Sequence, residues 1–249
     1  MARLLPWTLL GVLVLTQICY PLTAGALRAD LTVLTVVLGY LLSVSHALLT
    51  RGVRTAGALV ATATVGGFAV EAVGVATGFP FGTYDYSGQL GPKLLGVPLI
   101  IPLAWTWMAW PAWLAALRLA RRTPARVAVA AAGLAAWDLF LDPQMVAEGF
   151  WTWDSPTPAL PGVPGVPIGN YLGWLGFALL LMAVLAPAAG PRAAMPGPAD
   201  RPMLALWCWT YASSVLAHLA FLGLPWSALG GGALMGAAVI PLAAKLSRA

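Results

Sequence analysis

The sequence predicts an all-α protein, a polytopic bundle of about eight transmembrane helices that forms one membrane domain over residues 1–249. Of the 249 residues, 60% are hydrophobic and only 8% are charged. Soluble domains carry roughly 25% charged residues, so this chain lacks the polar surface that such a domain needs. Its apolar runs are about 20 residues long, which is the length that crosses a hydrocarbon core about 30 Å thick.

Eight apolar segments account for most of the chain, and short polar or Gly/Pro-rich connections separate them. We predict one spanning helix for each segment. The segments are residues 4–22, 31–49, 55–77, 97–117, 124–142, 168–186, 203–222 and 226–242.

The first segment has a second interpretation, as a signal peptide, because Arg3 precedes it and the small residues Ala24–Ala26 follow it. Cleavage there would leave seven helices. We expect a retained helix, because Leu4–Leu22 is long for the apolar core of a signal peptide.

Basic residues are distributed unevenly between the connections. When the segments are threaded alternately, one side receives eleven basic residues and the other receives only Arg28 and Lys93. The eleven are Arg3, Arg51, Arg54, Arg118, Arg121, Arg122, Arg126, Arg192, Arg201, Lys245 and Arg248. Because basic residues favour the cytoplasmic side, we predict that both termini are cytoplasmic. The same partition explains the net charge of +5 without a nucleic-acid partner.

Two extracytoplasmic connections are long, at residues 78–96 and 143–167, and they resemble one another. With an offset of 69 residues, eight of the 23 positions from Thr83 to Trp105 are identical to those from Thr152 to Trp174, where roughly two would be expected by chance. We therefore predict a duplicated helix–loop–helix unit, at residues 55–117 and 124–186. Sites often form where such repeats meet. The simpler alternative is two similar aromatic hairpins that only cap the bundle.

Three acidic residues lie within predicted helices. Glu71 is six residues before the outer end of its helix, about 9 Å deep at 1.5 Å per residue. Asp138 and Asp142 are four residues apart and share one helix face. A charge at mid-membrane costs roughly 2.5–3.5 kcal/mol, so such residues usually face the bundle interior and have a function. The alternatives are hydrogen bonds between helices, or simple solvation for Asp142.

These acids, together with Asp85 and Asp154 in the two loops, form the set of candidate catalytic carboxyl groups. A carboxyl group removed from water favours its neutral form and can act as an acid. Aromatic residues surround these acids in the sequence, and aromatic faces can stabilise a cation. The combination suits protonation of an alkene followed by capture of the carbocation by water.

Several motifs together resemble one family, the membrane-bound carotenoid biosynthesis proteins. Its CruF-type members include carotenoid 1,2-hydratases and bisanhydrobacterioruberin hydratases. The motifs are Glu71, Gly78–Tyr86, Gly96–Leu99, Trp137–Asp138, Leu141–Met145, Gly149–Trp153 and Gly165–Tyr171. The resemblance implies addition of water to the terminal isopropylidene double bond of an acyclic carotenoid, giving a tertiary alcohol without a cofactor. It also implies a carotenoid dissolved in the bilayer as substrate and other carotenoid biosynthesis enzymes as candidate partners.

The roles within this reaction are hypotheses. Glu71 or Asp142 would donate the proton, Asp138 would hold or deprotonate the attacking water, and Asn170 would orient that water. The candidate substrate-binding residues are Phe79, Tyr84, Tyr86, Trp137, Trp151, Trp153, Tyr171 and Trp174.

Two other classes of function remain open. A membrane prenyltransferase is suggested by the spacing of Asp138 and Asp142, although a second Asp-rich motif is missing and only Arg28 and Lys93 lie on that side. A proton-coupled transporter could use the same acids as a relay. A retinal protein is excluded, because it needs a lysine within a helix, whereas Lys93 lies in a loop and Lys245 at the C-terminal end.

The cysteines and histidines do not predict a metal site. Cys19 and Cys208 lie in different apolar runs and are expected to be packed thiols. Membrane di-iron oxygenases need many histidines, and this chain has only His46 and His218. We therefore predict that an oxygen atom added to the substrate comes from water.

Overall fold

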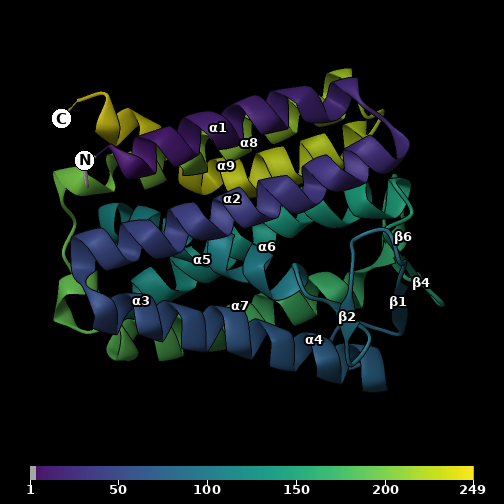
Figure 1. Cartoon of the computed structure of the whole chain (residues 1–249), viewed down its shortest axis with the longest axis horizontal. Helices are drawn as coiled ribbons and strands as arrows, with labels where there is room; N and C mark the ends of the chain where they lie inside the picture. Colours follow the sequence, from purple (N-terminus) through teal and green to yellow (C-terminus); the bar gives the residue numbers. More distant parts are fainter. Residues whose placement is uncertain (1–3, 249) are drawn as a thin grey trace.

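The computed structural model of the protein describes residues 4–248, so Arg3 lies outside the described residues. Across residues 4–248, eight long helices run between two ends of one bundle (Figure 1). They are α1 (Leu5–Cys19), α2 (Gly25–Arg51), the continuous α3 (Val53–Leu59), η2 (Val60–Val65) and α4 (Gly66–Thr77), α5 (Ile101–Leu119), α6 (Thr123–Ala147), α7 (Ile168–Ala188), α8 (Arg201–Ala220) and α9 (Pro225–Leu246). Short 3₁₀ turns lie at η1 (Tyr20–Leu22), η3 (Pro191–Ala194) and η4 (Pro198–Asp200).

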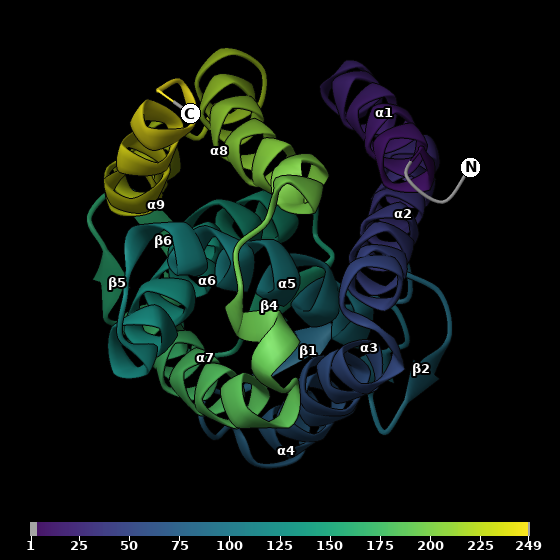
Figure 2. The same cartoon turned by 90° about the vertical axis from the view of Figure 1, so that its left-hand side faces the viewer.

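The predicted fold class is confirmed. Seven of the described helices are long and apolar enough to cross a membrane. The remaining one, α5, carries four tryptophans and is buried almost all round from Ala104 to Leu117. Figure 2, seen from the end with both termini, shows α5 inside the ring of the other helices. A helix that is apolar on every face is expected in such a central position.

Helix α6 is longer than predicted, because it continues through Pro143 to Ala147 and does not end at Asp142. Proline cannot donate a backbone hydrogen bond, so Pro143 leaves the carbonyl of Leu139 without its partner in the helix. The hydroxyl of Ser227 on α9 donates to that carbonyl at 2.5 Å. A helix within a membrane tolerates proline when a neighbour satisfies the freed carbonyl, and this contact explains why the prediction was wrong.

Helix α5 uses the same arrangement at Pro111, which leaves the carbonyl of Trp107 free. Ser43 on α2 donates to this carbonyl at 2.8 Å. The indole of Trp107 packs directly on Gly39, where a β-carbon would lie 2.4 Å from the ring. The small residue allows the two helices to approach closely, as is common in membrane bundles, and it fixes the orientation of the Trp107 ring.

The basic residues separate between the two ends as the alternating threading predicts. Arg51 ends α2 and Arg118 lies in the last turn of α5, at the end where the termini lie. The buried Asp200 accepts a hydrogen bond from Arg51 at 2.5 Å and lies 3.9 Å from Arg118. Arg28 lies at the opposite end, where it is paired with Glu148. Which end faces the cytoplasm stays a prediction.

The two long connections contain short strands at the end opposite the termini (Figure 1). Three antiparallel pairs form, β1 with β4, β2 with β3, and β5 with β6. The strands are β1 (Tyr84–Tyr86), β2 (Lys93–Leu94), β3 (Val97–Pro98), β4 (Trp151–Trp153), β5 (Ala159–Leu160) and β6 (Val163–Pro167). The β1–β4 pair joins the two loops that the sequence comparison aligns, and so it brings the two helix–loop–helix units together.

The register of this pair bears on the predicted duplication. Tyr84 lies opposite Trp153, and these positions are equivalent under the offset of 69 residues. Trp105 and Trp174 are equivalent under the same offset, and their rings stack with centroids 3.9 Å apart. A local two-fold relation between the units would give both contacts. The duplication itself stays a prediction.

Candidate active site

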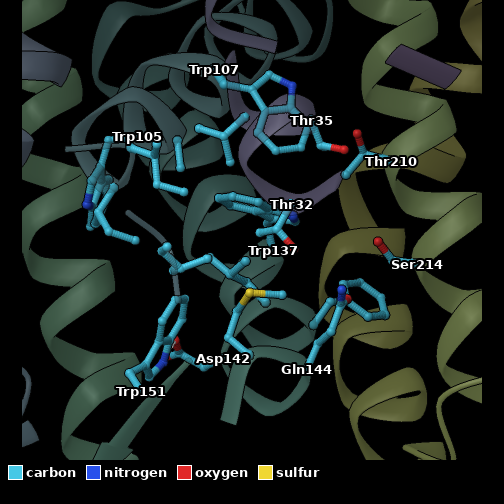
Figure 3. A pocket seen from close by; sticks show the side chains of 18 of the residues that line it. Thr32, Thr35, Trp105, Trp107, Trp137, Asp142, Gln144, Trp151, Thr210 and Ser214 are labelled. Atoms are coloured by element: carbon cyan, nitrogen blue, oxygen red, sulfur yellow. Dashed lines mark hydrogen bonds between the residues drawn. The ribbon is translucent and has the colours of Figure 1, made fainter. Parts of the chain in front are cut away.

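A cavity of about 140 Å³ lies in the half of the bundle nearest the strands. One side is formed by α4, α5, α6 and α7 together with β1 and β4, and the other by α1, α2 and α8. Figure 3 shows Asp142 and Trp151 in one part of the cavity and Thr210 and Ser214 in another. The cavity is therefore acidic and aromatic at one side and lined with hydroxyl groups at the other.

Glu71 lies on α4 and is 4% exposed. One of its oxygens, Oε2, accepts hydrogen bonds from the hydroxyls of Tyr84 at 2.6 Å and Tyr86 at 2.8 Å. The other oxygen, Oε1, accepts from the indole of Trp105 at 2.9 Å. Burial, followed by the charge of Glu71, raises the pKa of Tyr84 and of Tyr86. Both phenols therefore remain protonated donors toward the Glu71 carboxyl group.

Asp138 and Asp142 lie one turn apart on α6 and are buried. Asn170, in the first turn of α7, donates from Nδ2 to Asp138 Oδ2 at 2.9 Å and also to Asp142 Oδ2. Trp151 Nε1 donates to Asp142 Oδ1 at 3.1 Å. Asp138 Oδ1 has no hydrogen-bond partner among the described residues. The two carboxyl groups thus share one amide donor, and this arrangement is suited to a pair that holds a proton between them.

The strands present aromatic rings to the cavity because alternate side chains of a strand face opposite sides. Tyr84 and Tyr86 of β1 are buried, and so are Trp151 and Trp153 of β4. Tyr84 packs against Trp153 with centroids 5.6 Å apart, and Tyr86 against Trp151 at 5.5 Å. Strand pairing therefore places four aromatic rings at the end of the cavity nearest the strands.

Comparison with known proteins places the chain in a family. A family model described as "Carotenoid biosynthesis protein" matches residues 31–241, which is most of the chain. The chain belongs to this family. Bisanhydrobacterioruberin hydratase of Haloarcula japonica is 39% identical over 127 residues, which cover 49% of this chain and 42% of that relative. The chain thus matches less than half the length of this curated relative, and no solved structure matches.

Most of the predicted site residues of this carotenoid biosynthesis protein meet in the cavity. Asp138 lies behind the wall and contacts Asn170, which itself lines the cavity. The other predicted residues that line the cavity are Glu71, Asp142, Tyr84, Tyr86, Trp137, Trp151, Trp153 and Trp174.

Four predicted residues lie elsewhere. Asp85 and Asp154 are exposed, because each occupies a position that alternates with the inward-facing aromatic residues of its loop. Phe79 is 74% exposed and does not line the cavity. Tyr171 is partly buried but does not line the cavity, since it follows Asn170 by one residue and faces another side of α7. None of these four side chains lines the cavity, and their roles stay predictions.

Sequence reasoning missed several lining residues. Trp105 donates to Glu71 and stacks on Trp174, and the 69-residue offset that aligns these tryptophans could have identified it. Phe81 lies two residues beyond Phe79 and is the buried member of that motif. Thr35 and Thr210 also line the cavity, and nothing in the sequence distinguishes them from other helical threonines.

Proposed function

We propose that the protein is a carotenoid hydratase that adds water to the terminal isopropylidene double bond of an acyclic carotenoid. One observation carries the proposal: Glu71 and Asp142 line one aromatic cavity between apolar helices, and Asp138 lies behind its wall, bonded to the lining residue Asn170. Membership of the carotenoid biosynthesis family and similarity to a protein named as a hydratase support it.

The reaction begins with transfer of a proton from a carboxyl group to the less substituted carbon of the double bond. A tertiary carbocation remains on the other carbon. Water then attacks this cation through oxygen, and the extra proton of the resulting oxonium ion passes to a carboxylate. The net change is addition of one water molecule, and neither an oxidant nor a reductant is required.

We assign proton donation to Asp142. It faces the cavity and shares the Asn170 amide with Asp138, so the pair can hold one proton between two carboxyl groups. We assign the role of the anion to Glu71, because three donors converge on its two oxygens and such bonds offset part of the cost of burying a charge. As an anion beside the cavity, Glu71 would stabilise the carbocation and accept the proton released by water.

The tryptophans supply the remaining stabilisation. Trp174 stacks on Trp105 and lies edge-on to Trp137, with centroids 6.1 Å apart. All three rings line the cavity, so a carbocation held there would lie beside them. Cation–π interactions are worth about 2 kcal/mol or more in a desolvated site.

Incubation of purified protein in detergent with lycopene and with other acyclic carotenoids tests the proposal. We expect products heavier than the substrate by one or two water molecules. Asp142→Asn protein, purified in parallel, is the matched control and should give little product. Unchanged masses with every acyclic carotenoid, from protein that is folded and monodisperse, would refute the hydratase proposal. Product formation by purified protein would also show that transport is not the sole role.

A further inference from the structure

Two threonines in the cavity wall depart from the usual behaviour of threonine in a helix. A helical threonine commonly donates its hydroxyl to the carbonyl four residues earlier. Several in this protein do so, among them Thr16, Thr32, Thr50, Thr62 and Thr77. By contrast, the hydroxyls of Thr35 on α2 and Thr210 on α8 are buried and have no hydrogen-bond partner among the described residues.

The indole nitrogen of Trp107 on α5 is likewise buried and has no hydrogen-bond partner among the described residues. Trp107 is 4% exposed, Thr35 is 8% exposed and Thr210 is 2% exposed, and all three line the cavity. Helices α2 and α8 both pack on α5, and they bring the two threonines to the same side of the tryptophan in Figure 3. Figure 3 shows the three side chains in one part of the cavity, away from Asp142 and Trp151.

The orientation of Trp107 is fixed by packing. Its ring rests on Gly39, and its carbonyl accepts the hydroxyl of Ser43. The indole nitrogen is therefore held in one position, although no described residue accepts a hydrogen bond from it. A buried polar group without a hydrogen bond destabilises a protein. The cavity wall contains these three groups and also the hydroxyl of Tyr20 in that state, which indicates that the cavity normally holds a polar ligand.

We propose that Trp107, Thr35 and Thr210 form a second subsite of the cavity, which binds one hydroxyl oxygen. This oxygen belongs either to the carotenoid or to a water molecule kept for the reaction. A hydroxyl group fits the donor set, because its oxygen accepts from the indole and from one threonine while its hydrogen is donated to the other threonine. The ring of Trp137 packs against that of Trp107 with centroids 5.6 Å apart, and in Figure 3 it lies between Trp107 and Asp142. The inference rests on the proposed hydration.

The test uses the double variant Thr35→Val/Thr210→Val, which keeps the shape of both side chains and removes both hydroxyls. Thr32→Val is the matched control, because Thr32 lines the same cavity on α2 but its hydroxyl is already bonded to the carbonyl of Arg28 at 2.9 Å. Thr35→Ser/Thr210→Ser retains both hydroxyls and should restore activity. It serves as the folded reference if the valine variant accumulates poorly.

Turnover is measured with lycopene, which contains no oxygen, and with an acyclic carotenoid that carries a hydroxyl group near an intact isopropylidene end. If the subsite binds the substrate hydroxyl, the double valine variant raises KM for the hydroxylated carotenoid about 10-fold and leaves lycopene unchanged. If it binds water, kcat falls about 10-fold for both substrates while KM is unchanged. Values for both substrates within twofold of the Thr32→Val control would overturn the subsite.

Binding separates this inference from the hydration proposal. A polyene that enters the cavity should quench the surrounding tryptophans, so the affinity can be titrated without turnover. If the unmodified protein hydrates neither carotenoid, the proposed function fails. A water molecule kept for the reaction is then excluded as well, so the subsite can only bind the carotenoid hydroxyl. It then predicts about 10-fold weaker binding of the hydroxylated carotenoid to the valine variant. In that case, the subsite would be overturned if the hydroxylated carotenoid bound the unmodified protein, the double valine variant and the Thr32→Val control with equal affinity.

Discussion

Glu71 and Asp142 face the same cavity, but they differ in the hydrogen bonds that their oxygens accept. Glu71 accepts hydrogen bonds from two phenol hydroxyls and one indole. Asp142 accepts one from an indole and one from the Asn170 amide, which also donates to Asp138. This difference is the physical basis for giving the two acids different roles. It could not be predicted from the sequence, because every donor to Glu71 lies 13 or more residues away in the chain.

Amide replacement of the acids separates chemistry from packing. Asp142→Asn and Glu71→Gln keep the shape of the side chain but remove the transferable proton or the negative charge. General acid–base catalysis contributes roughly 10²- to 10⁴-fold, so turnover should fall by that order while the protein still accumulates in the membrane. Measurement of product per unit of purified protein checks this.

The exposed acids Asp85 and Asp154 supply the control for that experiment, because they lie outside the cavity. Asp85→Asn and Asp154→Asn should retain near-normal turnover. Near-normal turnover in both Asp142→Asn and Glu71→Gln would instead refute the assigned roles.

The buried phenols predict a pH dependence of stability. Burial raises the pKa of Tyr84 and Tyr86 above the ordinary value of 10.0, which applies in the unfolded chain. Below pH 10, the folded protein and the unfolded chain both keep the phenolic protons, so the contribution of these two tyrosines to the free energy of unfolding is fully present. Above pH 10 the unfolded chain loses protons that the folded protein retains, so the free energy of unfolding should decrease as pH rises. Thermal unfolding in detergent should show this decrease, and Tyr84→Phe/Tyr86→Phe should reduce it.

At the scale of elements, sequence patterns predicted which segments are helices better than where they end. The apolar run before Asp142 was expected to stop at Pro143, but Ser227 of α9 satisfies the freed carbonyl and the helix continues. Such a contact joins residues 88 positions apart, and no local pattern contains it. For the same reason, the loop motifs predicted the aromatic walls but not the strand register that turns Asp85 outward.

Close packing of α7 on the first loop offers a test of how the cavity wall is held. A β-carbon at Gly173 would lie 2.7 Å from the carbonyl oxygen of Pro80 and 2.9 Å from the ring of Phe81. Gly173→Ala should therefore displace the loop. Overpacking of this kind costs about 1–3 kcal/mol, so we expect a fall in Tm of about 2–10 °C together with lost turnover.

Gly176→Ala is the matched control on the same helix, because nothing lies within 4 Å of the position that a β-carbon would take there. Alanine is a better helix former than glycine, so this variant should be as stable as the unmodified protein or slightly more stable. Equal Tm values for the two alanine variants would show that the loop is not held by contact with Gly173.

At the scale of the whole molecule, the two ends of the bundle differ in charge and in composition. Arginines gather at the end with the termini, and the aromatic strands lie at the other end. A reporter that is active only in the cytoplasm should therefore work when fused after Arg122 or at the C-terminus, and it should fail near Pro158. Cytoplasmic activity at Pro158 would reverse the orientation and place the cavity in the inner half of the membrane.

The source of the oxygen atom tests the net reaction of the whole protein. In the proposed mechanism, the proton and the hydroxyl group both derive from water, because carboxyl groups protonate the alkene and water captures the cation. Product formed in H₂¹⁸O should therefore carry ¹⁸O in its tertiary alcohol, and cells grown without oxygen should still make it. Product formed in unlabelled water under ¹⁸O₂ is the control and should be unlabelled, as judged by mass spectrometry of the extracted pigment. Label that arrives from ¹⁸O₂ would mean that the acids and tryptophans of the cavity serve an oxygenation, and the hydratase proposal would then be wrong.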